Sequence, residues 1–419
     1  MNFSKQLNDL ISDHRAFEFV LFRAFLLLVT IGVGTTSCTT YKVKIKSAPP
    51  SINEIKYSVA VAEDWNNLFI RNEGWFGGDG IFTLALSGVD SADADAENKT
   101  LVLFSDSLIG EINDGKVDST FQMINNSVAL IKGVEPLDTA ISFHWSTNEN
   151  GDASSIFIPN TAASKPGEYF WLGDGFVNQE KGNDTYLFGY RIETTDAEVF
   201  PFKEVGNVLI VIPQGSKPPF SNQRQIDTPF YMEGSPEATG SFGAGILVNT
   251  GSSGAINPDG FVYIYGVKGI KKEVLVARVR PKDIEKFSSW RFWDGVDWQK
   301  EMQNARSIAD RASNELSVTP LKDGRYAMVF QKDAIGTEIG LRLSLSPEGP
   351  FGPIISVWDA ADDLKNGIQL ISYNAKAHPH LSGQNELLIS YNINSFDFLS
   401  AIKQQPHLYR PRFIRLKFE

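Results

Sequence analysis

The feature that most constrains the fold is a succession of short apolar segments, each ended by a turn, from about residue 57 to the C-terminus. Segments such as 81–86, 101–104, 186–192 and 274–279 hold four to seven mostly apolar residues and are separated by Gly, Asn, Asp and Pro. That pattern is typical of β-strands joined by tight turns. Residues 301–316 carry the most helical character but no long apolar stripe, so we expect a loop or one short helix there. The sequence predicts an all-β protein.

A coarse repeat organises these strands. Five segments begin in a turn of small or polar residues and then run into a strand, around Asp79, Asp174, Ala244, Glu315 and His378, at intervals of 95, 70, 71 and 63 residues. Each interval has room for four short strands, the content of one propeller blade. We predict a five-bladed β-propeller over residues 57–419, with residues 413–418 closing the ring against residues 57–62. A two-sheet sandwich is the alternative, but it requires closer turn spacing.

The N-terminus has the features of an export signal. Residues 24–34 form an apolar stretch that is short for a permanent membrane span, preceded by Arg15 and Arg23. Small polar residues then lead into Cys38, the only cysteine, in a segment that resembles a bacterial lipobox. We predict a signal peptide over residues 1–37, lipidation of Cys38 and a flexible tether over residues 38–56. A plain signal peptide followed by a chance cysteine is the alternative.

Charge and cysteine content exclude several classes of partner and site. The net charge of −11 repels phosphate backbones, so nucleic acid is not an expected partner. A single cysteine leaves no disulfide framework, no Cys-based zinc site and no catalytic thiol after lipidation. We expect an exported monomer, held at the cell envelope through its lipid, in the outer membrane.

Acidic residues recur at the starts of the repeats. Asp79, Asp174 and Glu315 stand at similar places in three repeats, and Asp106 closes the next strand of the first. Because the first strand of each blade faces the central channel, these side chains are expected to converge at one mouth. Crowded, poorly hydrated carboxylates ionise unequally, which supplies the protonated acid and the ionised base or nucleophile of glycoside cleavage. For each one alone, the alternative is a turn cap that accepts bonds from its own backbone.

Aromatic and polar residues beside these turns are candidates for substrate contact. Trp75 and Trp171 flank two acidic turns and could stack on a sugar ring, although packing between blades is the alternative. Asn126, in the segment INNSVAL, is predicted as a polar substrate contact. His378 opens the fifth repeat and is expected to line the floor of the funnel, where a packed structural role is the alternative.

Several motifs are absent. The chain has no GxSxG, P-loop, HExxH or GxGxxG, which disfavours serine hydrolases, NTPases, zincins and dinucleotide enzymes. The acidic run Asp90, Asp93, Asp95 and Glu97 lacks the spacing of an EF-hand, so we expect a solvated hairpin tip. The predicted chemistry requires no cofactor, and no metal ligands are predicted. A structural calcium ion in the channel is left open.

The order of segments along the chain carries a family resemblance. The segments are GWFGGDGIF, LFSDSLIG, INNSVAL, WLGDGF, NELSV and KAHPHLS, the last followed by ELLISYNIN. Over residues 57–417, they resemble five-bladed propeller lipoproteins of Gram-negative polysaccharide degraders. These are allied to bacterial endo-D-arabinanases and, more distantly, to other furanosidase propellers. The resemblance implies that Asp79 and Asp106 are acids of the first blade, Glu315 an acid of the fourth and His378 a central histidine. Ala244 departs from the pattern, because some five-bladed hydrolases carry an acid there.

Together these features predict a lipid-anchored glycoside hydrolase. Its expected substrate is a furanose-containing, arabinan-like polysaccharide, with Asp79 and Asp106 as acid and base or nucleophile, and Asp174 and Glu315 as tuning groups or alternative acids. The rival class is a non-catalytic surface glycan-binding lipoprotein, which would keep the aromatic residues and tolerate loss of the carboxylates. A scaffolding propeller would show neither binding nor turnover.

Overall fold

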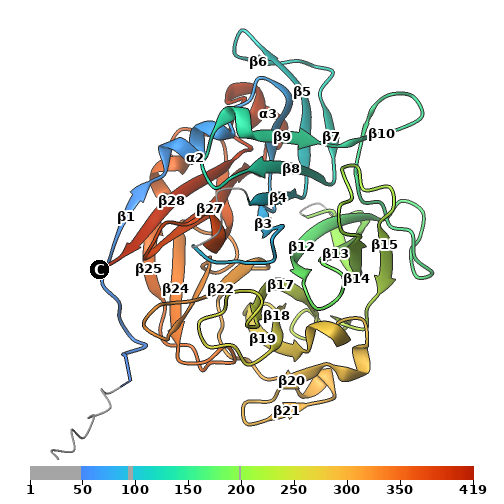
Figure 1. Cartoon of the computed structure of the whole chain (residues 1–419). Coiled ribbons are helices and arrows are strands. Elements are labelled where there is room, and N and C mark those ends of the chain that lie inside the picture. Colours follow the sequence, from blue (N-terminus) through green and yellow to red (C-terminus); the bar gives the residue numbers. More distant parts are fainter. Residues whose placement is uncertain (1–48, 93–97, 198–199) are drawn as a thin grey trace, which may run out of the picture. The chain divides into compact units, whose positions relative to one another are not determined.

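The computed structural model describes residues 49–92, 98–197 and 200–419, so the predicted signal peptide and Cys38 lie outside the described residues. Residues 50–419 form one compact unit. That unit is almost entirely β-structure, as predicted (Figure 1). In the described part of the chain, no helix combines the length and the apolar character that a membrane span needs.

Five antiparallel sheets succeed one another along the chain. The first sheet holds β3 (Phe82–Ala85), β4 (Lys99–Phe104), β8 (Ser127–Lys132) and β9 (Ile141–His144). The second holds β12 (Tyr169–Asn178), β13 (Asp184–Thr194), β14 (Phe202–Ile212) and β15 (Arg224–Asp227). The third holds β16 (Tyr231–Met232), β17 (Gly240–Asn249), β18 (Phe261–Lys268), β19 (Glu273–Val279), β20 (Arg291–Trp293) and β21 (Trp298–Gln299).

The fourth and fifth sheets complete the series. The fourth holds β22 (Leu316–Pro320), β23 (Tyr326–Gln331), β24 (Glu338–Ser344) and β25 (Ile355–Asp359). The fifth holds β26 (Leu370–Ala377), β27 (Glu386–Ser395), β28 (Pro411–Phe418) and β1 (Tyr57–Val61). In this sheet the first described strand pairs with the last, from Tyr57 opposite Phe418 to Val61 opposite Ile414. The predicted closure of the C-terminal run against residues 57–62 is therefore confirmed.

Smaller elements decorate these sheets. A further sheet contains β2 (Glu73–Gly78), β5 (Ser107–Asn113), β6 (Lys116–Val117) and β7 (Gln122–Ile124), and a short hairpin pairs β10 (Ser146–Thr147) with β11 (Ala153–Ser154). The described α-helices are α2 (Glu63–Leu68) and α3 (Phe398–Gln404). Single 3₁₀ turns are η1 (Asp138–Ala140), η2 (Pro281–Asp283), η3 (Phe287–Ser289), η4 (Met302–Asn304), η5 (Ala360–Leu364) and η6 (Pro379–Leu381). Residues 301–316 thus contain one 3₁₀ turn within loop, as expected.

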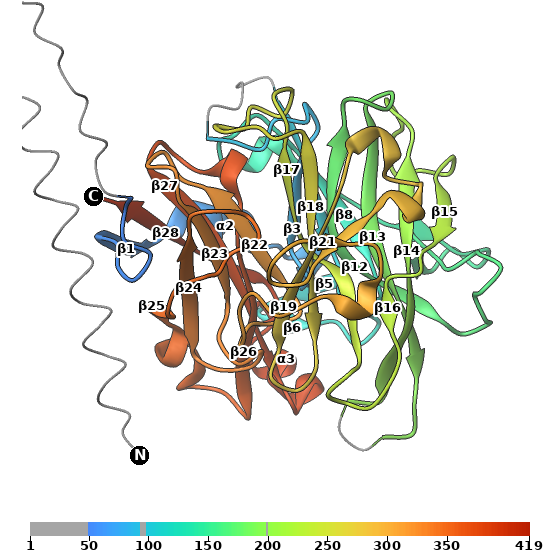
Figure 2. The ribbon, with the colours of Figure 1, turned by 90° about the horizontal axis from the view of Figure 1, so that it is seen from below.

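The first strand of each full repeat lies innermost. Successive inner strands β3, β12, β17, β22 and β26 contact one another, and the outer strands of each sheet follow them outwards (Figure 2). A cavity of about 40 Å³ is lined by residues from all five inner strands. Hydrophobic clusters fill the spaces between neighbouring sheets. The result is a propeller-like β fold whose inner strands surround a channel.

Bulges re-aim the inner strands at comparable places. The register of β12 shifts between Leu172 and Gly175, and that of β17 shifts between Phe242 and Gly245. A bulge bends a strand and redirects its side chains. Asp174 and Ala244 lie within these two bulges, so they are equivalent positions of the second and third sheets. Asp79 and Glu315 instead precede their strands, so the prediction that Asp174 occupies the same place as those two is wrong in this detail.

Candidate active site at the channel mouth

Two turns of the first repeat hold Asp79 and Asp106 side by side. Asp79 lies between β2 and β3, and Asp106 lies between β4 and β5. The Asp79 amide donates to the Asp106 carbonyl at 3.1 Å, and the Ser105 amide donates to the Asp79 carbonyl at 2.8 Å. Gly80 permits this approach, since it adopts a φ of +63° and a Cβ there would lie 2.6 Å from Ser105 Oγ. The segment GGDG is thus explained by the close contact of the two turns.

Hydroxyl groups and one ammonium face the Asp79 carboxylate. Tyr373 Oη donates to Asp79 Oδ2 at 2.6 Å. Burial raises the pKa of Asp79 above its ordinary value, while the Tyr373 and Tyr409 hydroxyls and the charge of Lys376 oppose that rise. Burial is the largest of these effects, so the pKa of Asp79 is raised on balance, although the donors and the positive charge limit the rise.

Nitrogen donors face the Asp106 carboxylate. Trp171 Nε1 donates to Asp106 Oδ1 at 3.0 Å, and Asn125 Nδ2 donates to the same oxygen at 3.3 Å. Burial, and next the charge of Asp79, raise the pKa of Asp106 to about 7. Both aspartates keep partial exposure. Both carboxyls of the pair therefore have raised pKa values, and they differ in their partners, with hydroxyls and an ammonium facing Asp79 and nitrogen donors facing Asp106.

A buried ion pair lies deeper in the channel. Lys376 Nζ, on β26, pairs with Glu315 Oε2 and lies 4.3 Å from the centre of the Phe82 ring. Burial raises the pKa of Glu315 to about 7, and the charge of Asp79 raises it further while Lys376 opposes the rise. Glu315 is 8% exposed and Lys376 1% exposed. Lys376 therefore links Glu315 and Asp79 electrostatically rather than contacting solvent.

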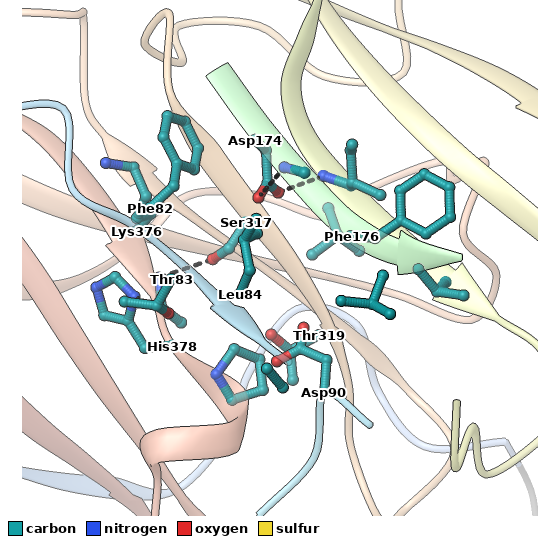
Figure 3. A pocket seen from close by; sticks show the side chains of 18 of the residues that line it. Phe82, Thr83, Leu84, Asp90, Asp174, Phe176, Ser317, Thr319, Lys376 and His378 are labelled. Atoms are coloured by element: carbon teal, nitrogen blue, oxygen red, sulfur yellow. Dashed lines mark hydrogen bonds between the residues drawn. The ribbon is translucent and has the colours of Figure 1, made fainter. Parts of the chain in front are cut away.

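Asp174 projects from the β12 bulge into the channel (Figure 3). Its Oδ1 accepts from the Gly175 amide at 2.8 Å, and its Oδ2 accepts from the Ile246 amide at 2.6 Å. Burial raises the pKa of Asp174 to about 7 despite these two bonds. With both oxygens bound to backbone amides of two different sheets, Asp174 joins β12 to β17 in addition to lining the channel.

The channel mouth thus brings together carboxylates that the sequence singled out separately. Asp79 and Asp106 touch through their backbones, and Lys376 acts electrostatically on Asp79, Asp174 and Glu315. The catalytic roles of these four residues remain predictions.

Two residues predicted to contact substrate are buried in the protein interior. Trp75 is 1% exposed and stacks on Phe143 at 4.5 Å. Asn126 is 0% exposed, and its amide bonds the backbone of Phe157 and Phe170. These contacts leave no ring face or amide group for a sugar, so the structure corrects both predictions. Trp171, by contrast, is only partly buried and donates to Asp106, so its stacking on a sugar ring stays a prediction.

His378 lies at the other end of β26 from Tyr373 and Asp79. Its Nδ1 is 2.8 Å from Thr83 Oγ1, and its Nε2 is 2.7 Å from Ser390 Oγ. Figure 3 shows His378 beside Thr83. The ring is 1% exposed, and burial lowers its pKa well below the ordinary value. His378 lines the channel, but it follows its inner strand rather than opening it. The contacts favour the structural alternative, in which a neutral imidazole ties β3 to β27.

Sequence reasoning missed several residues of the site. Tyr373, Tyr409, Asn125 and Lys376 touch or polarise the carboxylates but carry no motif. Glu204 on β14 is a further partly buried carboxyl, whose pKa burial raises to about 8. Tyr373 and Lys376 come from β26 of the fifth sheet and Tyr409 from the loop that precedes β28, so only the packing of these segments against the first repeat reveals them. A signal was available for Asn125, which is adjacent to Asn126.

Among the described residues, no group of three or more His, Cys, Asp or Glu side chains is placed to hold a metal ion. Of the acidic run, Asp90 contacts His380 Nδ1 at 2.8 Å, whereas residues 93–97 lie outside the described ranges. The channel calcium ion therefore stays a prediction without a ligand set.

Residues 62–418 match the model of a family described as a domain of unknown function, DUF5005. The chain belongs to that family. No curated protein matches it.

One solved structure shares the fold, and others show weaker similarity. A Bacteroides ovatus protein that carries the provisional name of a hydrolase is 21% identical with a TM-score of 0.66, over 88% of this chain and 92% of that one. The α-L-arabinofuranosidase of Podospora anserina in complex with cellotriose is 11% identical with a TM-score of 0.44, over 83% and 97%. A GH43_1 enzyme of Xanthomonas citri in complex with xylotriose is 15% identical with a TM-score of 0.38, over 85% and 93%. Only the first similarity is strong enough to argue from, and it concerns the fold alone.

Proposed function

We propose that the protein is a five-bladed β-propeller glycoside hydrolase that cleaves furanose-containing, arabinan-like polysaccharide. The observation that carries the proposal is the Asp79–Asp106 pair, whose turns are hydrogen-bonded to each other and whose carboxyls interact electrostatically but have different donors. Five sheets whose inner strands line one cavity support the blade count. The arabinan-like substrate rests on the sequence resemblance.

The surroundings of the pair assign its roles. Asp106, with a pKa of about 7, holds the proton and donates it to the glycosidic oxygen as that bond breaks. Asp79 is assigned the carboxylate role because Tyr373, Tyr409 and the charge of Lys376 oppose the rise that burial causes in its pKa. It either takes a proton from the attacking water or attacks the anomeric carbon itself. The anomeric configuration of the first product, read by NMR, distinguishes these two courses.

Replacement of each aspartate tests the proposal. We expect Asp106→Asn and Asp79→Asn to lower kcat on linear arabinan by about 10²- to 10⁴-fold, because each removes a proton-transfer or nucleophilic group. Reducing-sugar release measures turnover, and affinity electrophoresis measures binding, which should persist. Asp118→Asn, at an exposed turn bonded to Thr120, is the matched control and should keep full activity.

A glycan-binding protein without catalysis is the second candidate. It is favoured by Ala244, which occupies the β17 bulge where β12 carries Asp174. Binding of arabinan, arabinoxylan or arabinogalactan by the wild-type protein, with no sugar released from any of them, would establish it in place of the hydrolase.

We propose further that Cys38 is lipidated and holds the protein at the cell envelope, in the outer membrane. Arg325, in the turn between β22 and β23, donates to the carbonyls of Ser51 and Glu54, so the segment that follows the predicted signal peptide meets the propeller at this turn. Metabolic labelling with an alkyne-bearing fatty acid tests this proposal. Label should enter the wild-type protein and be lost in Cys38→Ser, and a wild-type chain without label would refute it.

A further inference from the structure

Four aromatic side chains form a continuous strip that begins at the carboxylate pair. Trp171 contacts Phe202 with ring centroids 4.5 Å apart, Phe202 contacts Phe200 at 5.8 Å, and Phe200 contacts Phe396 at 5.9 Å. The interplanar angles are 76°, 68° and 66°, so the rings meet edge to face. We call these four residues the aromatic strip. It connects the second sheet with the loop that follows β27 of the fifth sheet.

Phe200 and Phe396 form the outer half of the strip, and packing of the fold does not account for their exposure. Phe200 is 46% exposed and Phe396 is 53% exposed. Contiguous exposed aromatic surface marks interaction sites more often than scattered apolar residues do. Phe200 also has a φ of +57°, which is uncommon for a bulky side chain and is typical of functional sites when it occurs. Burial therefore accounts for neither the position nor the conformation of Phe200.

Both ends of the strip return to the carboxylate pair. At one end, Trp171 donates to Asp106 Oδ1. Near the other end, Asn394 Nδ2 donates to Tyr373 Oη at 3.3 Å, and Tyr373 donates to Asp79. Phe396 follows Asn394 by two residues at the end of β27. The strip therefore borders the mouth in which the two carboxyls lie.

We propose that the aromatic strip is a substrate-binding track, which holds several consecutive sugar rings of one polysaccharide chain beside Asp79 and Asp106. Sugar rings stack through their C–H faces on aromatic side chains, and a row of four such side chains fits a chain rather than a single sugar. The net charge of −11 favours a neutral glycan over a polyanionic one. The proposal rests on the proposed function for the position of the cleaved bond and specifies that the substrate is an extended, uncharged chain.

Binding to a turnover-deficient protein tests the track without relying on activity. The background is Asp106→Asn, and the probes are linear arabinan, arabinoxylan and arabinogalactan in affinity electrophoresis. In this background, Phe200→Ala or Phe396→Ala should weaken the binding that retards the protein in a glycan-containing gel about fivefold or more. The two substitutions together should weaken it further. Ile270→Ala is the control, because Ile270 is 67% exposed but lies outside the strip, and it should leave retention unchanged.

A kinetic comparison provides a second readout. In the otherwise wild-type enzyme, Phe200→Ala and Phe396→Ala should raise KM for the polysaccharide about fivefold or more. The effect on kcat/KM should be smaller for a short aryl arabinofuranoside than for the polysaccharide, because a single sugar contacts less of the strip.

The outcomes separate this inference from the proposed hydrolase. Strip-dependent retention without turnover would support the track and refute the hydrolase. Turnover with unchanged retention and KM in the two Phe variants would refute the track and support the hydrolase. No retention of the Asp106→Asn protein by any of the three glycans would overturn the track.

Discussion

Replacing Asp174 by Asn tests whether the channel carboxylates are held as neutral acids. Asp174 has a pKa of about 7 in the folded protein, against 3.8 ordinarily. Between these values the folded state holds a proton that the unfolded state has released, so stability is present at low pH and is lost as pH rises towards 7. One pKa unit corresponds to about 1.4 kcal/mol. Ionisation of this single group therefore lowers the free energy of unfolding by about 4 kcal/mol as pH rises past both pKa values. About 2 kcal/mol of that loss falls between pH 5 and pH 7.

The Asn variant does not titrate, so its stability relative to the wild type should depend on pH. At pH 5 we expect Asp174→Asn to cost about 1–3 kcal/mol, because one of the two backbone amides that Asp174 binds loses its acceptor. At pH 8.5 the wild-type protein carries a buried charge that the variant lacks. The variant should then match or exceed the stability of the wild type.

Urea unfolding followed by tryptophan fluorescence, at both pH values and constant ionic strength, measures the two differences. Asp118→Asn is the matched control, because the pKa of this exposed carboxyl is lowered and its replacement should cost the same at pH 5 and pH 8.5. If the difference between wild type and Asp174→Asn is the same at both pH values, the assignment of a raised pKa to Asp174 is wrong.

Three further substitutions separate site residues from structural ones. Trp171→Phe removes a donor to Asp106, so the pKa of Asp106 should rise and the alkaline limb of the kcat/KM–pH profile should move up by about 0.5–1 unit. Trp75→Phe shrinks a buried ring and should cost about 1–3 kcal/mol in urea unfolding, with no change in that profile. His378→Asn breaks at least one buried hydrogen bond and should cost about 1–3 kcal/mol at pH 7.5. Because the pKa of His378 is lowered, the wild type loses stability as pH falls below about 6.5, so the cost of this substitution should be smaller at pH 5. An equal cost at the two pH values would contradict the neutral, buried imidazole.

The sequence by itself determined the class of fold and the two turns of the site. Alternating short segments and turn residues predicted the all-β chain, and the repeat interval predicted sheets of about four strands. GWFGGDGIF and LFSDSLIG placed Asp79 and Asp106 correctly at the ends of neighbouring strands. These features are local, because turn chemistry and strand length are written in adjacent residues.

Tertiary structure decided which side chains face the channel. Asn126 turns into the interior while Asn125 reaches Asp106, and Trp75 packs in the core while Trp171 borders the mouth. Adjacent residues of an extended chain point to opposite faces, and only the neighbouring sheets determine which face is the open one. The partners that set the charge of the site are equally distant in sequence. Tyr373 reaches Asp79 because the fifth sheet packs against the first, and Lys376 reaches Glu315 because the fifth sheet packs against the fourth.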